Sequence, residues 1–274
     1  MANAACSICR EGIQVPNHTF AVCAYGESPF LEECVKSLVV QNGNPEILAV
    51  TSTPNALIEA VCSKYDLTLL VRDGKPGIAD DWNFAISCAK TDLVTVAHQD
   101  DVYERDYSRC LIAAYENNPD LLIYFTNYGE LRDDGAVNVN ELLRIKRGML
   151  FPLKDGRLKR SKLVRRRILS CGSAICCPSV SFNLKRLSQP IFETSMKCDL
   201  DWQAWERISK QDGSFYYDSK ILMYHRIHEQ SETTHLIGDN TRSREDLQML
   251  NKFWPSSIAR LINRAYSKSQ KSNG

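Results

Sequence analysis

The chain has 274 residues, of which 43% are hydrophobic and 24% are charged, and its formal net charge is +1. This composition is typical of a globular protein with one large core or two small ones, and the balanced charge argues against a dedicated polyanion binder. Because no apolar run approaches the length of a membrane span, no signal peptide opens the sequence and the cysteines are scattered singly, we expect a cytoplasmic protein.

Strands and helices alternate in the first half of the sequence. Short runs rich in β-branched and apolar residues predict strands, and the longer runs between them, each with one apolar face, predict helices. In chain order we expect strands at 19–24, 47–50, 67–71, 93–97 and 121–125, and helices after Ser28, after Thr53-Pro54, at 79–90 and at 104–117. This alternation predicts an α/β fold with a doubly wound, mostly parallel sheet flanked by helices.

The alternation breaks after Asn127, where the second half begins. Residues 144–167 contain eleven Lys or Arg and one acid, Asp155. This stretch is either a solvated helical face with a loop, or an electrostatic patch for phosphates or an anionic membrane surface. Farther along we expect strands at 176–183, 214–217 and 221–224, a helix at 199–210 with Trp202, Trp205 and Ile208 inward, and an amphipathic segment at 258–266.

Polar clusters follow the predicted strands at places that a single cleft would gather. Asp100 and Asp101 come directly after the buried strand at 93–97, where two adjacent carboxylates are unfavourable unless a cation lies beside them. The alternative is that they cap the following helix. The other clusters are Ala24-Tyr25-Gly26-Glu27, Arg72-Asp73-Gly74 with Gly77 and Asn83, Asp199-Leu200-Asp201-Trp202, and residues 224–233. Ligands of open α/β sheets bind at this carboxyl edge of the strands.

In their order along the chain, these clusters resemble the motifs of family 2 glycosyltransferases with the GT-A fold. The resemblance rests on CAYGES, GIADDWN, AHQDD, CDLDW and YHRIHEQSETT. It implies a GT-A domain at 19–235, with a nucleotide-sugar-binding half at 19–127 and an acceptor half, or acceptor-side subregion, at 128–235. Residues 1–18 are then an N-terminal lead-in, and residues 236–274 are a C-terminal helical tail.

The resemblance implies a role for each cluster. Tyr25 would stack on the nucleotide base, and Asp100, Asp101 and His228 would hold Mn²⁺ or Mg²⁺, cations that prefer hard oxygen ligands. Arg226 and His228 would lie near the diphosphate, whereas a packed, hydrogen-bonded role is expected for His225. The implied substrate-binding residues are Ala24, Tyr25, Glu27, Thr51, Ser52, Asp73, Gly77, Asn83, Gln99, Asp100, Arg226 and His228.

One segment departs from the family pattern. The family usually carries paired acids after its second strand, and one of them reads uracil. This chain has Val50-Thr51-Ser52-Thr53 at that place. Hydroxyl groups can still hydrogen-bond a base edge. UDP is therefore the default nucleotide.

The catalytic base implied by the family pattern is Asp199, with Asp201 as the second choice. A base must take the proton from the acceptor hydroxyl as that hydroxyl attacks the anomeric carbon. Asp201 has an alternative interpretation as the N-cap of the helix that carries Trp202. The resemblance implies a metal-dependent single displacement with inversion and no covalent enzyme intermediate.

The expected function is transfer of a sugar from a nucleotide diphosphate donor to a hydroxyl of a glycan or lipid-linked saccharide, as in cell-surface polysaccharide synthesis. Two other classes stay open: a sugar nucleotidyltransferase, and a non-enzymatic polyanion- or membrane-binding protein. No nucleic-acid partner is expected. Residues 144–167 and 258–271 are expected to allow peripheral contact with the inner face of a membrane.

Overall fold

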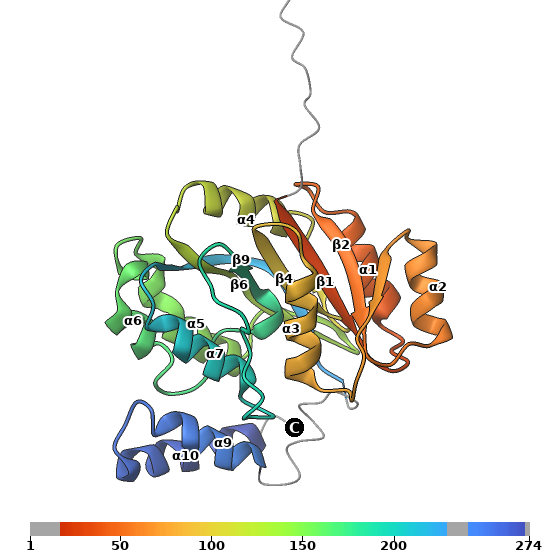
Figure 1. Cartoon of the computed structure of the whole chain (residues 1–274). Helices are drawn as coiled ribbons and strands as arrows, with labels where there is room; N and C mark the ends of the chain where they lie inside the picture. The colour runs from red at the N-terminus through yellow and green to blue at the C-terminus, as the bar shows by residue number, and fades with distance from the viewer. Residues whose placement is uncertain (1–16, 229–240, 272–274) are drawn as a thin grey trace, which may run out of the picture.

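The computed structural model describes residues 17–228 and 241–271 (Figure 1). Most of the predicted N-terminal lead-in and residues 229–235 of the last predicted motif lie outside the described residues. The first half contains β1 (His18–Ala24), α1 (Leu31–Val39), β2 (Glu46–Thr51), α2 (Ala56–Lys64), β3 (Thr68–Val71), α3 (Ile78–Cys88), β4 (Leu93–His98), β5 (Val102–Tyr103), α4 (Tyr107–Glu116) and β6 (Leu121–Arg132).

The second half is more irregular and holds several short 3₁₀ helices. Its elements are β7 (Gly135–Val137), α5 (Glu141–Leu150), η1 (Phe151–Lys154), η2 (Leu158–Arg160), α6 (Lys162–Arg167), η3 (Cys177–Ser179), β8 (Val180–Asn183), α7 (Leu200–Ser209), β9 (Ser214–Arg226), α9 (Thr241–Leu250) and α10 (Ser256–Lys271). The basic stretch at 144–167 therefore consists of helical segments and their connections.

Within the described residues, one nine-stranded sheet has the order β3-β2-β1-β4-β8-β6-β9-β5, with β7 paired to β6. The strands β3, β2, β1 and β4 are parallel neighbours, as are β6 and β9. The inserted strand β8 runs antiparallel to both β4 and β6. This arrangement confirms the predicted mostly parallel α/β sheet. The chain reverses its direction of winding between β1 and β4, which is where ligands of such sheets bind.

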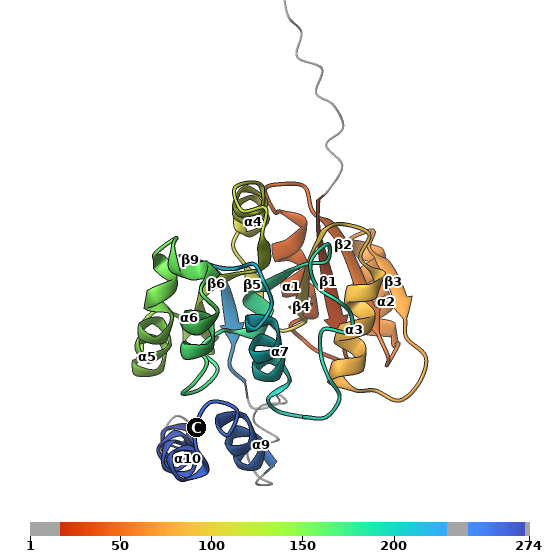
Figure 2. The ribbon, with the colours of Figure 1, turned by 60° about the vertical axis from the view of Figure 1, so that its left-hand side comes forward.

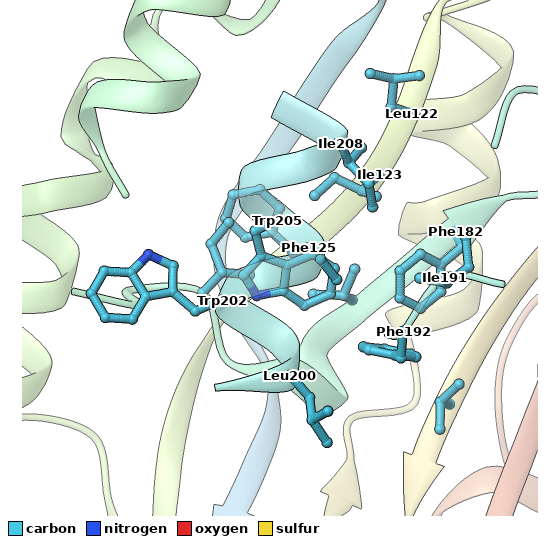
Figure 3. Packing of buried hydrophobic residues seen from close by; sticks show 14 of the residues in the cluster. Leu122, Ile123, Phe125, Phe182, Ile191, Phe192, Leu200, Trp202, Trp205 and Ile208 are labelled. Atoms are coloured by element: carbon cyan, nitrogen blue, oxygen red, sulfur yellow. The ribbon is translucent and has the colours of Figure 1, made fainter. Parts of the chain in front are cut away.

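Helices cover both faces of the sheet (Figures 1 and 2). Helices α1, α2 and α4 pack on one face, and α3 and α7 pack on the other. The predicted inward residues of α7, Trp202, Trp205 and Ile208, are all buried. Figure 3 shows Trp205 turned toward Phe125 and Phe182, while Trp202 extends the opposite way. Replacing a buried indole such as that of Trp205 with Ala typically costs about 3–5 kcal/mol.

Several local predictions differ from the structure. The strand predicted at 176–183 begins only at Val180, because Cys177–Ser179 form the 3₁₀ helix η3. Helix α2 is capped by Asn55, whose Oδ1 accepts the N–H of Ile58 at 3.0 Å, rather than by Thr53. The strands predicted at 214–217 and 221–224 form the single strand β9, because an irregular register near Thr126 and Asn127 absorbs the break. Asp100 and Asp101 do not cap a helix, since they lead into β5 and α4 begins only at Tyr107.

Candidate active site

The loops after β1 and β4 are joined by a pair of hydrogen bonds. Gln99 Oε1 accepts the backbone N–H of Tyr25 at 2.9 Å, and Gln99 Nε2 donates to the Tyr25 carbonyl at 3.0 Å. The Tyr25 ring itself is 52% exposed. The amide of Gln99 thus fixes the backbone of the loop and leaves the aromatic ring at the surface beside the strand ends.

The loop after β1 is also tied to the loop after β2. Gly26 donates its N–H to Thr53 Oγ1 at 2.8 Å, and its carbonyl accepts from Asn55 Nδ2 at 2.9 Å. Gly26 has a φ of +58°, a left-handed conformation that glycine adopts without a steric penalty. The buried Thr51 accepts the N–H of Thr53 at 3.0 Å, so its hydroxyl supports this turn.

Asp81 of α3 supplies a carboxylate beside Ser52. Its Oδ2 accepts a hydrogen bond from Ser52 Oγ at 2.9 Å, and its Oδ1 accepts from Arg72 Nε at 2.6 Å. Where the resembled family has acids after its second strand, this chain therefore brings a carboxylate from α3 to the same place. The sequence alone placed no role on Asp81, because its partners are 29 and 9 residues away.

Asp100 contacts the loop between β1 and α1 and the segment that follows β9. Its Oδ1 accepts from Ser28 Oγ at 3.0 Å, and its Oδ2 lies 3.2 Å from His228 Nε2. Both residues were predicted as metal ligands, and the structure brings them together. The Asp100 carboxylate is partly exposed, in contrast to that of its neighbour Asp101.

Asp101 is fully buried, with 0% of its surface exposed. Its Oδ1 lies 2.9 Å from His225 Nδ1 and accepts the backbone N–H of Arg226 at 2.9 Å. His98 Nδ1 is 3.9 Å from Asp101 Oδ2. The expected packed, hydrogen-bonded position of His225 is confirmed. In this arrangement Asp101 joins the end of β4 to the end of β9.

The charges of the buried Asp101 and the partly exposed His225 support each other. Burial acts to raise the pKa of Asp101, but His225, His98 and the Arg226 N–H outweigh it, so this pKa lies below its ordinary value. Burial likewise acts to lower the pKa of His225, and the Asp101 carboxylate outweighs it and raises that pKa. The electrostatic shifts therefore favour a carboxylate on Asp101 and a protonated imidazole on His225.

Arg226 at the end of β9 contacts α1 and the residue before it. Its Nε donates to the Asp100 carbonyl at 2.9 Å, its Nη2 bonds Glu33 Oε2 at 2.5 Å, and its guanidinium lies 4.4 Å from the centroid of the Phe30 ring. The predicted role of Arg226 near a diphosphate thus comes with a structural one. Phe30 and Glu33 were not singled out in the sequence, where they read as ordinary residues at the start of a helix.

The other predicted donor-side residues differ in their surroundings. Asn83 donates from Nδ2 to the Phe192 carbonyl at 2.8 Å and accepts the Phe192 N–H at 3.0 Å, so its amide holds the loop before α7. Gly77 is the N-cap of α3, where an added Cβ would lie 2.9 Å from Asp80 Oδ2. Among the remaining predicted residues, Ala24 is buried, whereas Glu27 and Asp73 are exposed.

The two candidate bases face different sides of the N-terminus of α7. Asp199 occupies the N-cap position, so Asp201, in the first turn, is not the N-cap. Asp201 Oδ1 accepts the N–H of Trp202 at 2.6 Å, and Oδ2 accepts from Ser173 Oγ at 3.4 Å. Asp199 instead lies against Asp246 of α9. Burial, then the Asp246 charge, raises the pKa of Asp199 to about 9.

Asp201 and the Asp101–His225 pair have two neighbours in common. Burial raises the pKa of the Cys176 thiol, and the carboxylates of both Asp101 and Asp201 add to that shift. Burial also raises the pKa of Asp201, and Lys146 of α5 acts to lower the pKa of both Asp201 and His225. Cys176 and Lys146 therefore lie within electrostatic reach of both Asp201 and the Asp101–His225 pair.

A comparison with known protein families identifies the family of the chain. Residues 19–191 match the profile described as Glycosyl transferase family 2, which is more than half of the chain. The chain belongs to glycosyl transferase family 2. A comparison with curated proteins gives no match.

Solved structures of glycosyltransferases share the fold. One is S. aureus TarS 1-349 in complex with UDP-GlcNAc, at 15% identity and a TM-score of 0.60, covering 90% of this chain and 70% of that one. Another is the mannosyltransferase PcManGT from Pyrobaculum calidifontis in complex with GDP-Man and Mn²⁺, at 16% identity and a TM-score of 0.58, covering 92% of this chain and 69% of that one. The chain is thus a glycosyltransferase with the GT-A fold.

The donor side of this glycosyltransferase fits a divalent cation bound through few protein groups. Within residues 17–228 and 241–271, no ready-made group of three or more His, Cys, Asp or Glu side chains could hold a metal ion. A cation such as Mg²⁺ is, however, commonly held by one or two carboxylates together with substrate phosphates. The Asp100 carboxylate and the His228 imidazole, 3.2 Å apart, are suited to that mode.

Proposed function

We propose that this glycosyltransferase transfers a sugar from a nucleotide diphosphate donor, with a UDP-sugar as the default, to a hydroxyl of a glycan or lipid-linked saccharide. The proposed reaction is metal-dependent and inverts the anomeric centre. The observation that carries the proposal is the meeting of Asp100 and His228 at 3.2 Å, at the strand ends that also hold the exposed ring of Tyr25.

On the donor side, each predicted residue has a proposed task. Tyr25 stacks on the base, and Ser52, whose hydroxyl donates to Asp81, offers its oxygen lone pairs to a donor on the base edge. Ala24, Glu27, Thr51, Asp73, Gly77, Asn83 and Gln99 shape the loops around the nucleotide. Mn²⁺ or Mg²⁺ held by Asp100 and His228 would act as a Lewis acid toward the leaving diphosphate.

On the acceptor side, Asp201 is the stronger candidate for the base. Burial raises the pKa of both carboxyl groups, but Asp199 also contacts a second carboxyl group, that of Asp246, which with burial raises its pKa to about 9, whereas Lys146 acts to lower the pKa of Asp201. A group that holds its own proton at neutral pH does not accept another. General-base assistance of this kind is typically worth about 10²–10⁴ in rate.

The structural relatives support a nucleotide-sugar donor without fixing which one. TarS is seen with UDP-GlcNAc and PcManGT with GDP-Man and Mn²⁺, and each has only 15–16% identity to this chain. The nucleotidyltransferase alternative usually needs a Gly-rich basic loop after the first strand. The loop here, CAYGES, has no Lys or Arg.

A thermal-shift screen tests the proposal. A ligand that binds only the folded state raises the apparent stability, so the matching nucleotide sugar should raise the Tm in the presence of Mn²⁺ and lose this effect with EDTA. UDP-GlcNAc and GDP-Man are the first donors to include. Release of nucleoside diphosphate on turnover supports the transferase, and release of pyrophosphate would instead identify a nucleotidyltransferase.

We further propose that the basic stretch lets the enzyme rest on an anionic membrane surface. Phe151 and Leu163 are 67% and 78% exposed, and the exposed cations Arg144, Lys154 and Arg157 belong to the same stretch. Two other exposed cations of the stretch pair with acidic residues of the protein, Arg160 with Asp120 at 2.6 Å and Lys162 with Asp212 at 2.6 Å. No described helix is long and apolar enough to cross a bilayer.

A further inference from the structure

Helix α9 fixes the turn that carries both candidate bases. The Glu245 carboxylate accepts three consecutive backbone N–H groups, from Lys197 at 3.0 Å, Cys198 at 2.7 Å and Asp199 at 3.2 Å. Glu245 is only 5% exposed. The N–H groups at the start of a helix lack partners within the helix, and an anion there is favourable. Glu245 thus binds the turn that leads into α7 from a different helix, and the N–H of Asp199, the N-cap residue, is the one of the three that belongs to the helix terminus.

The next residue of α9 pairs with Asp199. The side chains of Asp199 and Asp246 are 5% and 1% exposed. Both oxygens of Asp246 and Oδ2 of Asp199 have no donor among the residues that the structure describes, although the two carboxyl groups are in hydrogen-bonding contact with each other. Two carboxylates so close and so buried cannot both be ionised without a large penalty. A single shared proton supplies the donor that both groups lack.

The other charged groups near Asp199 and Asp246 do not remove the need for a shared proton. Arg242 of α9 acts to lower the pKa of both groups, and Glu245 and Asp201 act in the other direction on Asp246. The net result is a pKa of about 9 for Asp199 and about 6 for Asp246, with burial the main cause of both. Lys146 reaches Asp201 rather than Asp199. Between these values the pair as a whole holds one proton.

We infer that α9 is a wall of the acceptor site, in which Glu245 positions the turn before α7 and Asp246 shares a proton with Asp199. That α9 borders an acceptor site rests on the proposed function, whereas the shared proton does not. Glu245 and Asp246 are then positioning residues, which keep Asp201 as the carboxylate able to take a proton. Helix α9 lies outside the matched residues 19–191 and beyond the predicted domain end at 235.

The shared proton is tested by carbon-13 NMR of protein labelled at the Asp carboxyl carbons. In the unaltered protein, two resonances should titrate together, with apparent pKa values near 6 and 9. Asp246→Asn should move the Asp199 titration to lower pH by at least one unit, and Asp199→Asn should remove the upper step. Asp133→Asn, in the exposed β6–β7 turn, is the matched control and should change neither step. Independent titration of both groups below pH 5 would overturn the shared proton.

The pH dependence of the protein's stability gives a second test of the shared proton. A carboxyl group with a raised pKa keeps its proton in the folded state, so stability falls as pH rises from its ordinary value of 3.8 toward 9. Asp246→Asn should reduce this fall in Tm, and Asp133→Asn should not. If Asp246 contributed only packing, Asp246→Asn would lower the Tm by the same amount at every pH. That result would contradict the inference.

The acceptor wall is tested by kinetics once a donor and an acceptor are known. Glu245→Ala should raise the acceptor KM or lower kcat at least tenfold, while the Kd of the donor, measured by calorimetry, changes less than twofold. Glu245→Gln retains one acceptor oxygen and should recover part of the loss. Equal loss of donor binding would refute the wall. If no transfer is found with any substrate, the proposed function fails, and the NMR titration still decides the carboxyl pair.

Discussion

The Nε2 atom of His228 lies 3.2 Å from Oδ2 of Asp100, although 128 residues separate the two in the chain. The contact brings the segment after the last strand to the carboxyl edge of β4. It unites two of the three residues predicted as metal ligands, while the third, Asp101, turns into the protein and pairs with His225. The two adjacent carboxylates thus have different surroundings, since that of Asp100 is partly exposed and that of Asp101 is buried.

Asp100→Ala should abolish the Mn²⁺ dependence of nucleotide-sugar binding without unfolding the protein. The carboxylate is partly exposed, so its loss removes a cation ligand more than a core contact. Calorimetry should show at least a tenfold higher Kd in Mn²⁺, and EDTA should bring the unaltered enzyme to the same value. His228→Ala should behave likewise, and Asp133→Asn is the control. Unchanged Mn²⁺ dependence in Asp100→Ala and His228→Ala would show that the cation lies elsewhere.

Asp101→Ala should act on stability instead. The change leaves the partly exposed His225 and the Arg226 N–H without their buried partner, and such a loss typically costs about 1–3 kcal/mol. Urea denaturation should show this loss for Asp101→Ala and less than half of it for Asp100→Ala. Equal effects of the two substitutions would contradict the different roles expected for the two carboxylates.

The same pair has a pH signature with a defined sign. His225 has a raised pKa, so its contribution is fully present below its ordinary value of 6.5 and is lost as pH rises through the raised value. Asp101 has a lowered pKa, so its contribution is present above 3.8 and is lost as pH falls through the lowered value. The stability difference between the unaltered protein and His225→Gln should therefore shrink above pH 6.5.

Tyr25→Ala should weaken the binding of free nucleoside diphosphate and of the sugar nucleotide alike. The ring is half exposed, so its removal leaves the fold intact, and stacking on a base is typically worth about 1–3 kcal/mol. That corresponds to a Kd raised roughly 5- to 150-fold. Tyr25→Phe keeps the stacking face and should bind nearly as well. Equal affinity for Tyr25→Ala and the unaltered enzyme would remove Tyr25 from the site.

Asp201→Asn should keep donor and metal binding and lose transfer by about 10²–10⁴-fold, the usual worth of a general base. The amide preserves the shape and the bond to the Trp202 N–H but cannot take the acceptor proton. Asp199→Asn should retain more activity, because Asp199 is the group that already carries a proton. If Asp199→Asn abolishes transfer and Asp201→Asn spares it, the order first expected from the sequence is the right one.

Double substitution of Phe151 and Leu163 with Ser should lower co-sedimentation with vesicles that contain anionic lipid. Both side chains are exposed in the basic stretch, and each cation near such a surface adds about 1 kcal/mol. Tm and nucleotide binding should not change. Arg165→Gln is the contrast, since Arg165 of the same stretch is fully buried and should affect stability rather than sedimentation. Binding that ignores the anionic lipid content would refute the membrane surface.

The sequence predicted those features that depend on near neighbours. The alternation of strands and helices and the inward face of Trp202, Trp205 and Ile208 follow from the spacing of apolar residues, and the structure confirms them. The meeting of Asp100 with His228 followed from the order of the family's motifs, because no local pattern joins residues so far apart.

The rest depended on contacts that no local pattern reveals. The amide of Asn83 is taken up by Phe192, 109 residues later, and Glu245 finds its three N–H partners 46 to 48 residues back in the chain. Asn55 rather than Thr53 caps α2 because the Thr53 hydroxyl already accepts the N–H of Gly26. In each case the tertiary structure decides which hydrogen-bond partner the polar group has.

The short pairing of β5 with β9 has a consequence for biosynthesis. Val102 and Tyr103, directly after Asp101, pair with Tyr224 and Met223, and 124 residues separate Asp101 from His225. At about 5–20 residues per second, a ribosome needs roughly 6–25 s to make that segment. During this time the nascent chain carries the Asp100–Asp101 carboxylates without His225 and His228. A chain arrested before β9 therefore lacks both the Asp101–His225 pair and the Asp100–His228 contact.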